Sequence, residues 1–348
     1  DIDGSYNTVD ALGVASVSDD GIQILGGGDN TVTIGTGGVH GGDDGIQIGG
    51  QGGSQTSDDN TVIVAGDVTA VDIGVRIDGD SNKVEVNGDD GGVAITAVGL
   101  GIGITGDTNN VFADGNIIGG VAIEGDVNKV EAGNVDGSVT IDGEKNIADL
   151  GDISGSATIT GDDNDLDAGA ITSALGITGN FNEAHITSAG ATTVGGDENI
   201  VDASGALASL AITGDDNNVD SASVTGDATV VGDKNEVDTG DIGGLASLTG
   251  DDNDLDAGAI TGALTVDGDS NDADITSAGA TTVTGDDNNV DASGALASLA
   301  VTGDDNNVDS ASVTGDATVS GDDNEVDTGD IGGLASLTGD ENDLNAGA

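Results

Sequence analysis

The chain lacks several residue types that most folded proteins of its length use. Its 348 residues include no cysteine, proline, methionine or tryptophan, and the only aromatic residues are Tyr6, Phe112 and Phe181. Without cysteine there can be no disulfide bonds. Without large apolar side chains, a core must be built from valine, isoleucine, leucine and alanine, which suits an interior only one or two side chains across.

Basic residues are also scarce. Five lysines and arginines stand against 66 acidic residues, giving a formal net charge of −61. Such a charge repels nucleic acid and anionic lipid, which excludes both as partners. No apolar run is long enough to insert into a membrane. High acidity is also typical of disordered chains, but here valine and isoleucine alternate regularly with polar residues, which favours a folded structure.

What the sequence does contain is a repeated Gly-Asp-x-Asn motif. A fixed period this short, with glycine at the corner and β-branched residues on both sides, is typical of a solenoid. In the regular part of the chain the asparagines recur every 17–19 residues, at Asn109, Asn128, Asn146, Asn164, Asn182, Asn199, Asn217, Asn235, Asn253, Asn271, Asn288, Asn306, Asn324 and Asn342.

The pattern within one repeat predicts strands joined by tight corners. Leu210 and Ile212 alternate onto one face of a half-buried strand, and the next strand begins near Val219. Gly214 suits the corner between them, and a second corner is expected near Gly226. We therefore predict an all-β fold, a β-solenoid of about 18 stacked coils with two short strands per coil.

Coil length divides the chain into two regions. Residues 1–105 have irregular, wider coils with glycine-rich loops such as 49–53, whereas residues 106–348 have regular coils of 17–19 residues. A longer repeat overlies the regular region, because residues 160–248 align without a gap to 249–337 and differ at 14 positions.

The two ends of the sequence favour secretion of the protein and its assembly with other copies. A chain without methionine does not begin at its initiator, so we expect Asp1 to be a processed terminus and the protein to be secreted to the extracellular space or cell surface. A third copy of the long repeat stops at Ala348 without a capping coil, which favours stacking onto another molecule.

The asparagines have two possible roles, as a structural ladder or as ligands. Identical asparagines on successive coils can form a column of side-chain amides that fixes register, and this is the interpretation we favour. The predicted ladder comprises Asn164, Asn182, Asn199, Asn217, Asn235, Asn253, Asn271, Asn288, Asn306, Asn324 and Asn342.

The corner aspartates are candidate metal ligands. Stacking would align them about 4.8 Å apart, where like charges repel. A Ca²⁺ ion between two such carboxylates would have suitable oxygen distances, and solvated acids that bind counterions loosely are the alternative. The candidate calcium ladder comprises Asp215, Asp233, Asp251, Asp269, Asp286, Asp304, Asp322 and Asp340.

Enzymatic activity and an ice-binding face both have little support. The only histidines are His40 and His185, and no catalytic grouping accompanies them, so we predict that the protein is not an enzyme. An ice-binding solenoid needs threonines in register. Comparison of Ala157–Thr160 with 191–194 and 210–213 gives an interrupted array.

The coil plan resembles the curlin repeats of bacterial curli fibres, on the strength of coil length and corners such as Gly214-Asp215-Asp216-Asn217. This resemblance implies a secreted, self-assembling matrix fibre. We therefore predict an extracellular filament subunit that forms a head-to-tail homopolymer in the presence of divalent cations. A monomeric Ca²⁺-dependent adhesin stalk or an ice-binding solenoid is the alternative.

Overall fold

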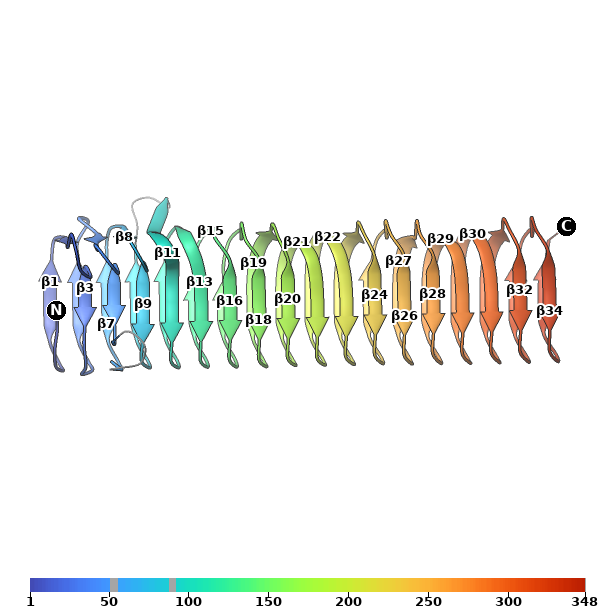
Figure 1. The fold of residues 1–348 in the computed structure, drawn as a ribbon, viewed down its shortest axis with the longest axis horizontal. Helices are drawn as coiled ribbons and strands as arrows, with labels where there is room; N and C mark the ends of the chain where they lie inside the picture. The colour runs from blue at the N-terminus through green and yellow to red at the C-terminus, as the bar shows by residue number, and fades with distance from the viewer. Residues whose placement is uncertain (51–55, 88–91, 348) are drawn as a thin grey trace. The chain divides into compact units, whose positions relative to one another are not determined.

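Alternating apolar and polar residues between glycine corners produce short parallel strands, coil after coil (Figure 1). The computed structural model describes residues 1–50, 56–87 and 92–347, so part of the predicted loop at 49–53 lies outside the described residues. The described residues contain no helix, and hence none that could cross a membrane. The predicted class, an all-β parallel solenoid, is confirmed.

The described residues make about 16 turns, slightly fewer than the 18 coils predicted. A count of asparagine corners exceeds the number of complete turns, because 18 corners delimit only 17 intervals. The chain divides into two compact units, residues 1–186 and 187–348. The irregular coils of 1–105 lie entirely within the first unit.

Each coil has three sides, which we call first, middle and last in chain order after the corner asparagine. In unit 1 the first side is formed by β1 (Thr8–Ala11), β4 (Thr31–Ile34), β7 (Thr61–Val64), β10 (Lys83–Val86), β12 (Asn110–Ala113), β14 (Lys129–Glu131), β17 (Ile147–Asp149) and β19 (Asp165–Ile171). The last side is formed by β3 (Ile22–Ile24), β6 (Ile46–Ile48), β9 (Val75–Asp78), β16 (Val139–Asp142), β18 (Ala157–Thr160), β20 (Leu175–Thr178) and the ends of β11 (Val93–Thr105) and β13 (Asn116–Glu124). The middle side holds β2 (Val14–Ala15), β5 (Val39–His40), β8 (Val68–Ala70) and β15 (Val135–Asp136).

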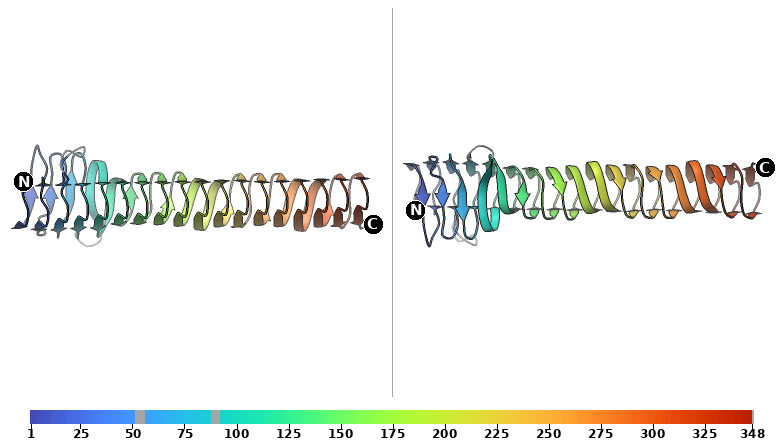
Figure 2. Two further views of the ribbon diagram at one scale, coloured as in Figure 1. Left: turned by 90° about the horizontal axis from the view of Figure 1, so that it is seen from below. Right: turned by 90° about the horizontal axis from the view of Figure 1, so that it is seen from above.

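Unit 2 repeats this plan with longer strands, some of which continue around a corner (Figure 2). Its first sides lie in β22 (Ile200–Thr213), β23 (Asn218–Val224), β25 (Glu236–Thr239), β27 (Asp254–Ala259), β29 (Asp272–Thr284), β30 (Asn289–Thr302), β31 (Asn307–Val313), β33 (Glu325–Thr328) and β35 (Asp343–Ala346). Its last sides lie in β24 (Ala228–Val231), β26 (Ala246–Thr249), β28 (Leu264–Asp267), β32 (Ala317–Ser320), β34 (Ala335–Thr338) and the ends of β22, β29 and β30. The remaining strand, β21 (Glu183–Gly195), includes residues of both units.

The middle side is the feature that sequence reasoning missed. In several coils it is only one residue wide, as at Val224, which pairs in parallel with Ile242, which in turn pairs with Ile260. The expected corner near Gly226 separates the middle side from the last side, and a further bend separates the first side from the middle. A single inward residue makes no period-two pattern, so this third side could not be predicted from the alternation of apolar and polar residues.

Inward side chains from all three sides fill the interior. In the coil after Asn217 these are Val219, Val224, Ala228 and Val230, each no more than 2% exposed. Parallel pairing places each residue on its equivalent in the next coil, as with Val219 on Val237. Valine, isoleucine, leucine and alanine are therefore large enough to close the core.

Two coils bury a threonine where neighbouring coils have leucine. Thr281 pairs in register with Leu264 on one side and Leu299 on the other, and its hydroxyl has no hydrogen-bond partner among the described residues. Thr192, its equivalent in the preceding long repeat, is also buried with no hydrogen-bond partner for its hydroxyl among the described residues. This register also corrects the comparison of threonine positions that we made from the sequence in considering an ice-binding face. The last side of that coil starts at Thr192, so the alignment of 191–194 with Ala157–Thr160 was one residue out.

Close stacking at the corners predicts a position-specific cost of adding a methyl group. Gly179 has φ of 131°, and a Cβ there would overlap the carbonyl oxygen of Gly161 in the neighbouring coil. We expect Gly179→Ala to destabilise the protein by about 3 kcal/mol or more, measured as a lower thermal unfolding temperature by circular dichroism.

The matched control lies in the same coil. A Cβ on Gly176 meets nothing within 4 Å, so Gly176→Ala should change stability by no more than about 0.5 kcal/mol. Equal effects of the two substitutions would contradict the tight stacking at the corner.

Candidate functional site

The Gly-Asp-x-Asn corner is built by two successive departures from ordinary backbone geometry. Gly214 has φ of 131°, and Asp216, two residues later, has φ of 56°. The residue before every ladder asparagine takes this left-handed conformation, whether it is aspartate, Lys234 or Phe181. Such a conformation is uncommon outside glycine, asparagine and aspartate. The sequence pointed only to the glycine, because the residue type at the second position varies.

Hydrogen bonds along the column use the full capacity of each asparagine amide. Asn217 Nδ2 donates to Asn235 Oδ1 in the following coil at 3.0 Å and to the carbonyl oxygen of Gly196 in the preceding coil at 2.8 Å. Asn217 Oδ1 accepts from the backbone N–H and the Nδ2 of Asn199, both at 3.0 Å. The side chain is about 1% exposed. A buried amide with both donors and its acceptor in use is a structural group, with nothing left for a ligand.

The same arrangement recurs within each unit. In unit 1 the hydrogen-bonded column contains Asn7, Asn30, Asn60, Asn82, Asn109, Asn128, Asn146, Asn164 and Asn182. In unit 2 it contains Asn199, Asn217, Asn235, Asn253, Asn271, Asn288, Asn306, Asn324 and Asn342. The irregular coils of residues 1–105 thus keep the corner even where their loops are longer.

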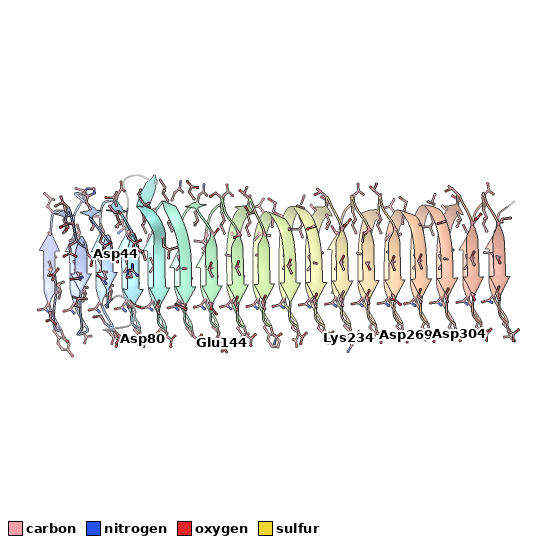
Figure 3. The ribbon with its side chains drawn as sticks, viewed as in Figure 1. Asp44, Asp80, Glu144, Lys234, Asp269 and Asp304 are labelled. Carbon is pink, nitrogen blue, oxygen red and sulfur yellow. The ribbon has the colours of Figure 1, made fainter. Side chains whose placement is uncertain are left out.

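The corner aspartates form a second, exposed column beside the asparagines. Asp215 Oδ1 accepts the backbone N–H of Asp233 at 2.8 Å, and Asp233 Oδ1 accepts that of Asp251 at 2.8 Å. This contact continues along unit 2 through Asp269, Asp286, Asp304, Asp322 and Asp340. Figure 3 labels Asp269 and Asp304 at this edge, with Asp80 and Glu144 at the corresponding edge of unit 1. One oxygen of each carboxylate therefore caps the next coil, and the other remains available to a cation.

Sequence reasoning missed the one place where three carboxylates converge among the described residues. Oxygens of Asp43, Asp44 and Asp72 lie within 4.8 Å of one another. Asp44 is fully buried, accepts the N–H of Ile73 at 3.0 Å and pairs with Arg76, whose Nε lies 2.6 Å from Asp44 Oδ2. Arg76 Nη2 also lies 3.4 Å from Asp72. The guanidinium supplies the positive charge that a metal ion would otherwise bring.

The outward positions of the first side in unit 2 carry a denser acidic array. Eight aspartates stack in register there: Asp202, Asp220, Asp238, Asp256, Asp274, Asp291, Asp309 and Asp327. Glu236, Asp254 and Asp272 form a parallel row two residues earlier along three of these strands. Between the two rows lies a hollow of about 260 Å³.

Crowding in this array alters the acidity of several carboxyls. Burial raises the pKa of Asp254 above its ordinary value of 3.8, and the nearby charges of Asp272 and Glu236 raise it further. Burial and the adjacent aspartates likewise raise the pKa of Asp220 and Asp291. These shifts mean that burial and neighbouring negative charges both disfavour the ionised carboxylates in the folded state.

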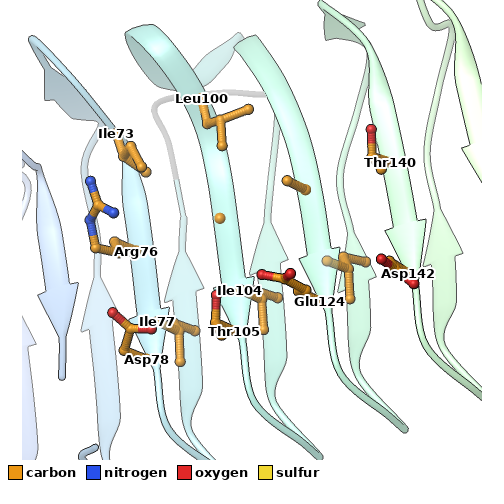
Figure 4. Close-up of a pocket in the computed structure, with 13 residues that line it drawn as sticks. Ile73, Arg76, Ile77, Asp78, Leu100, Ile104, Thr105, Glu124, Thr140 and Asp142 are labelled. Carbon is orange, nitrogen blue, oxygen red and sulfur yellow. The ribbon is translucent and has the colours of Figure 1, made fainter. Parts of the chain in front are cut away.

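A larger hollow, of about 560 Å³, lies on the outward last side of unit 1 (Figure 4). Its floor includes Gly103, whose missing side chain leaves room beside Leu100. Arg76 lines one side and Glu124 and Asp142 line another. Because Arg76 is already held by Asp44 and Asp72, the hollow presents no uncommitted cation.

The two histidines occupy separate, ordinary surface positions. His185 Nε2 lies 2.7 Å from Glu183 Oε1, two residues away on the same strand. His40 Nδ1 contacts the hydroxyl of Thr69. Neither contact resembles an activated nucleophile with its base, and the prediction that the protein is not an enzyme stays a prediction.

Comparison with known proteins adds one local similarity. A family described as "Protein of unknown function (DUF3060)" matches residues 283–333, a stretch that contains the corners at Asn288, Asn306 and Asn324. No curated protein and no solved structure matches the chain.

The amide column can be tested by substituting one atom. Asn306 Nδ2 donates to Asn324 Oδ1 at 3.0 Å and to the oxygen of Gly285 at 2.8 Å. Asn306→Asp replaces this donor with an oxygen and buries a charge, so we expect a loss of about 3 kcal/mol or more in stability, measured by chemical denaturation.

Asn307→Asp is the control, because it adds the same charge at the exposed neighbouring position. It should cost less than about 1 kcal/mol. If Asn306→Asp were no more harmful than Asn307→Asp, the asparagines would not hold the coils in register.

The raised pKa values predict an unusual response to acid. The folded state retains protons on Asp220, Asp254 and Asp291 at a higher pH than the unfolded chain does. The free energy of unfolding therefore falls as pH rises from 3.8 through the raised pKa values. We expect the unfolding temperature to rise on acidification from pH 7 toward about pH 4.

Asp254→Asn should flatten this dependence and raise stability at pH 7, because it removes one of the crowded charges. Asp10→Asn, which lies outside the array, serves as its control. A steady loss of stability between pH 7 and pH 4 would contradict the analysis of the acidic array.

Proposed function

We propose that this protein is a structural subunit of a self-assembling extracellular filament, in which chains join end to end by strand pairing between coils. The observation that carries the proposal is the interchangeability of the coils. In unit 2, β27 pairs residue for residue with β25 on one edge and with β29 on the other. Each coil thus offers matching edges in both directions along the solenoid.

Unsatisfied coil edges favour this kind of contact. A strand edge presents free N–H and C=O groups that template pairing with another chain. A coil edge of this protein also presents an asparagine amide, whose hydrogen bonds are complete only with a coil on both sides, as at Asn253. Identical amides stacked in register stabilise cross-β assemblies in the same way.

Charge sets the conditions for assembly. Every added chain brings a net charge of −61, so divalent cations or high salt must screen the junction. We propose that Ca²⁺ binds the free oxygens of the corner column from Asp215 to Asp340. Two carboxylates one coil apart provide only part of a calcium shell, and water supplies the remaining ligands.

The resemblance to curlin repeats supports the same function and an extracellular location, since a matrix fibre assembles outside the cell. The monomeric alternatives, an adhesin stalk or an ice-binding solenoid, do not use the matching coil edges.

Electron microscopy of the purified chain tests the proposal. We expect long unbranched fibres in the presence of Ca²⁺, and shorter or fewer fibres after addition of a calcium chelator at low salt. Fibres that persist under chelation would retain the filament and reject the calcium role. Particles of one short length under every condition, including high salt and high protein concentration, would overturn the filament and favour a monomeric solenoid.

A further inference from the structure

The outward face of the last side in unit 2 differs in charge from the first side of the same coils. The sixteen outward positions on the eight last sides from Leu210 to Thr338 carry one charge, at Asp267. They are Ala211, Thr213, Thr229, Val231, Ser247, Thr249, Thr265, Asp267, Thr282, Thr284, Ala300, Thr302, Thr318, Ser320, Ser336 and Thr338. Twelve of the sixteen corresponding positions on the first sides, from Ile200 to Asp327, are acidic. We call this surface, with its single charge, the hydroxyl face.

The hydroxyl face is regular along its length. The last-side segments that form it pair in parallel without a register shift, from Thr213 on Val231 to Ser320 on Thr338. Most of its side chains are threonine, serine or alanine, so none stands far above its neighbours. Such a surface can approach another flat sheet closely.

Compared with the first side, this face can meet a second copy at a lower electrostatic cost. Two acidic first sides brought together would oppose dense columns of carboxylates in a poorly hydrated gap, where repulsion is strong. Two hydroxyl faces bring together small side chains that interdigitate, as paired sheets do in steric zippers. Charges such as Asp227 and Asp316 remain at the edge, where salt screens them.

The area of the face decides when pairing occurs. Eight coils at about 4.8 Å and strands of four residues at about 3.3 Å each give roughly 500 Å² per partner. A total of about 1,000 Å² is at the lower limit for a specific interface. One chain therefore pairs weakly, whereas chains joined in a filament repeat the contact and pair firmly.

We propose that the hydroxyl face is the site of lateral pairing between two copies of this chain, so that filaments consist of two solenoids joined face to face. This inference rests on the proposed filament function. A two-fold contact uses the same face on both partners. Each copy has one hydroxyl face, and the two-fold contact occupies it. Lateral growth through this face therefore stops at two.

The experiment compares the mass per length of filaments formed by the full chain and by two variants of equal charge. The face variant carries Thr229→Asp, Thr282→Asp and Thr318→Asp, all on the hydroxyl face. The control carries Asn218→Asp, Asn289→Asp and Asn307→Asp, all outward on the first side. We expect filaments of the parent chain and the control to have twice the mass per length of those formed by the face variant.

Other results separate this inference from the filament proposal. Parent filaments of single mass, or double filaments retained by the face variant, would overturn lateral pairing and leave end-to-end assembly intact. Bundles of more than two would also overturn it. If no filaments form, the oligomeric state is measured by sedimentation at high protein concentration and high salt. Dimers of the parent chain and the control that the face variant does not form would support lateral pairing alone. Monomers of all three proteins would overturn both proposals. Thermal hysteresis lost only in the face variant, with no pairing, would assign the face to ice.

Discussion

The hydrogen bond between one buried asparagine amide and the next is the interaction on which the structure depends. Valine and isoleucine drive burial, but apolar contacts are not directional and would tolerate a shift of one strand along another. The amide at the corner does not, because Asn217 must meet Asn235 on one side and the carbonyl of Gly196 on the other. The register between neighbouring coils is therefore fixed once per coil, at the corner, and this sets the pairing of the strands on either side.

Fixed register has an electrostatic consequence, because it stacks like upon like. The aspartates of the first side fall into continuous columns, and burial together with repulsion from neighbouring carboxylates raises the pKa values of Asp220, Asp254 and Asp291. The same stacking gathers threonine and serine on the last side and keeps charge away from it. The net charge of −61 is thus unevenly distributed around the coil. The acidic first side favours the binding of cations, whereas the last side favours close contact with another surface.

Much of this could be predicted from the sequence, for reasons that individual residues make clear. The spacing of Asn109 through Asn342 indicated the solenoid, and Leu210, Ile212 and Val219 are buried as the alternation indicated. The middle side escaped prediction because one inward residue, such as Val224, has no periodicity. The left-handed conformation at Asp216 escaped because its residue type varies between coils. The hydroxyl face was obscured by a register error of a single residue at Thr192, since one step moves every side chain of a strand to the opposite face.

The column of amides can be observed directly by hydrogen-exchange NMR of asparagine side chains. The corner asparagines are buried and the outward asparagine Asn307 is exposed, so each chain contains its own reference. We expect the Nδ2 protons of buried residues such as Asn217 and Asn306 to exchange orders of magnitude more slowly than those of the exposed Asn307. Equally fast exchange at all of these side chains would contradict this expectation, since an amide open to solvent cannot set the register of the coils.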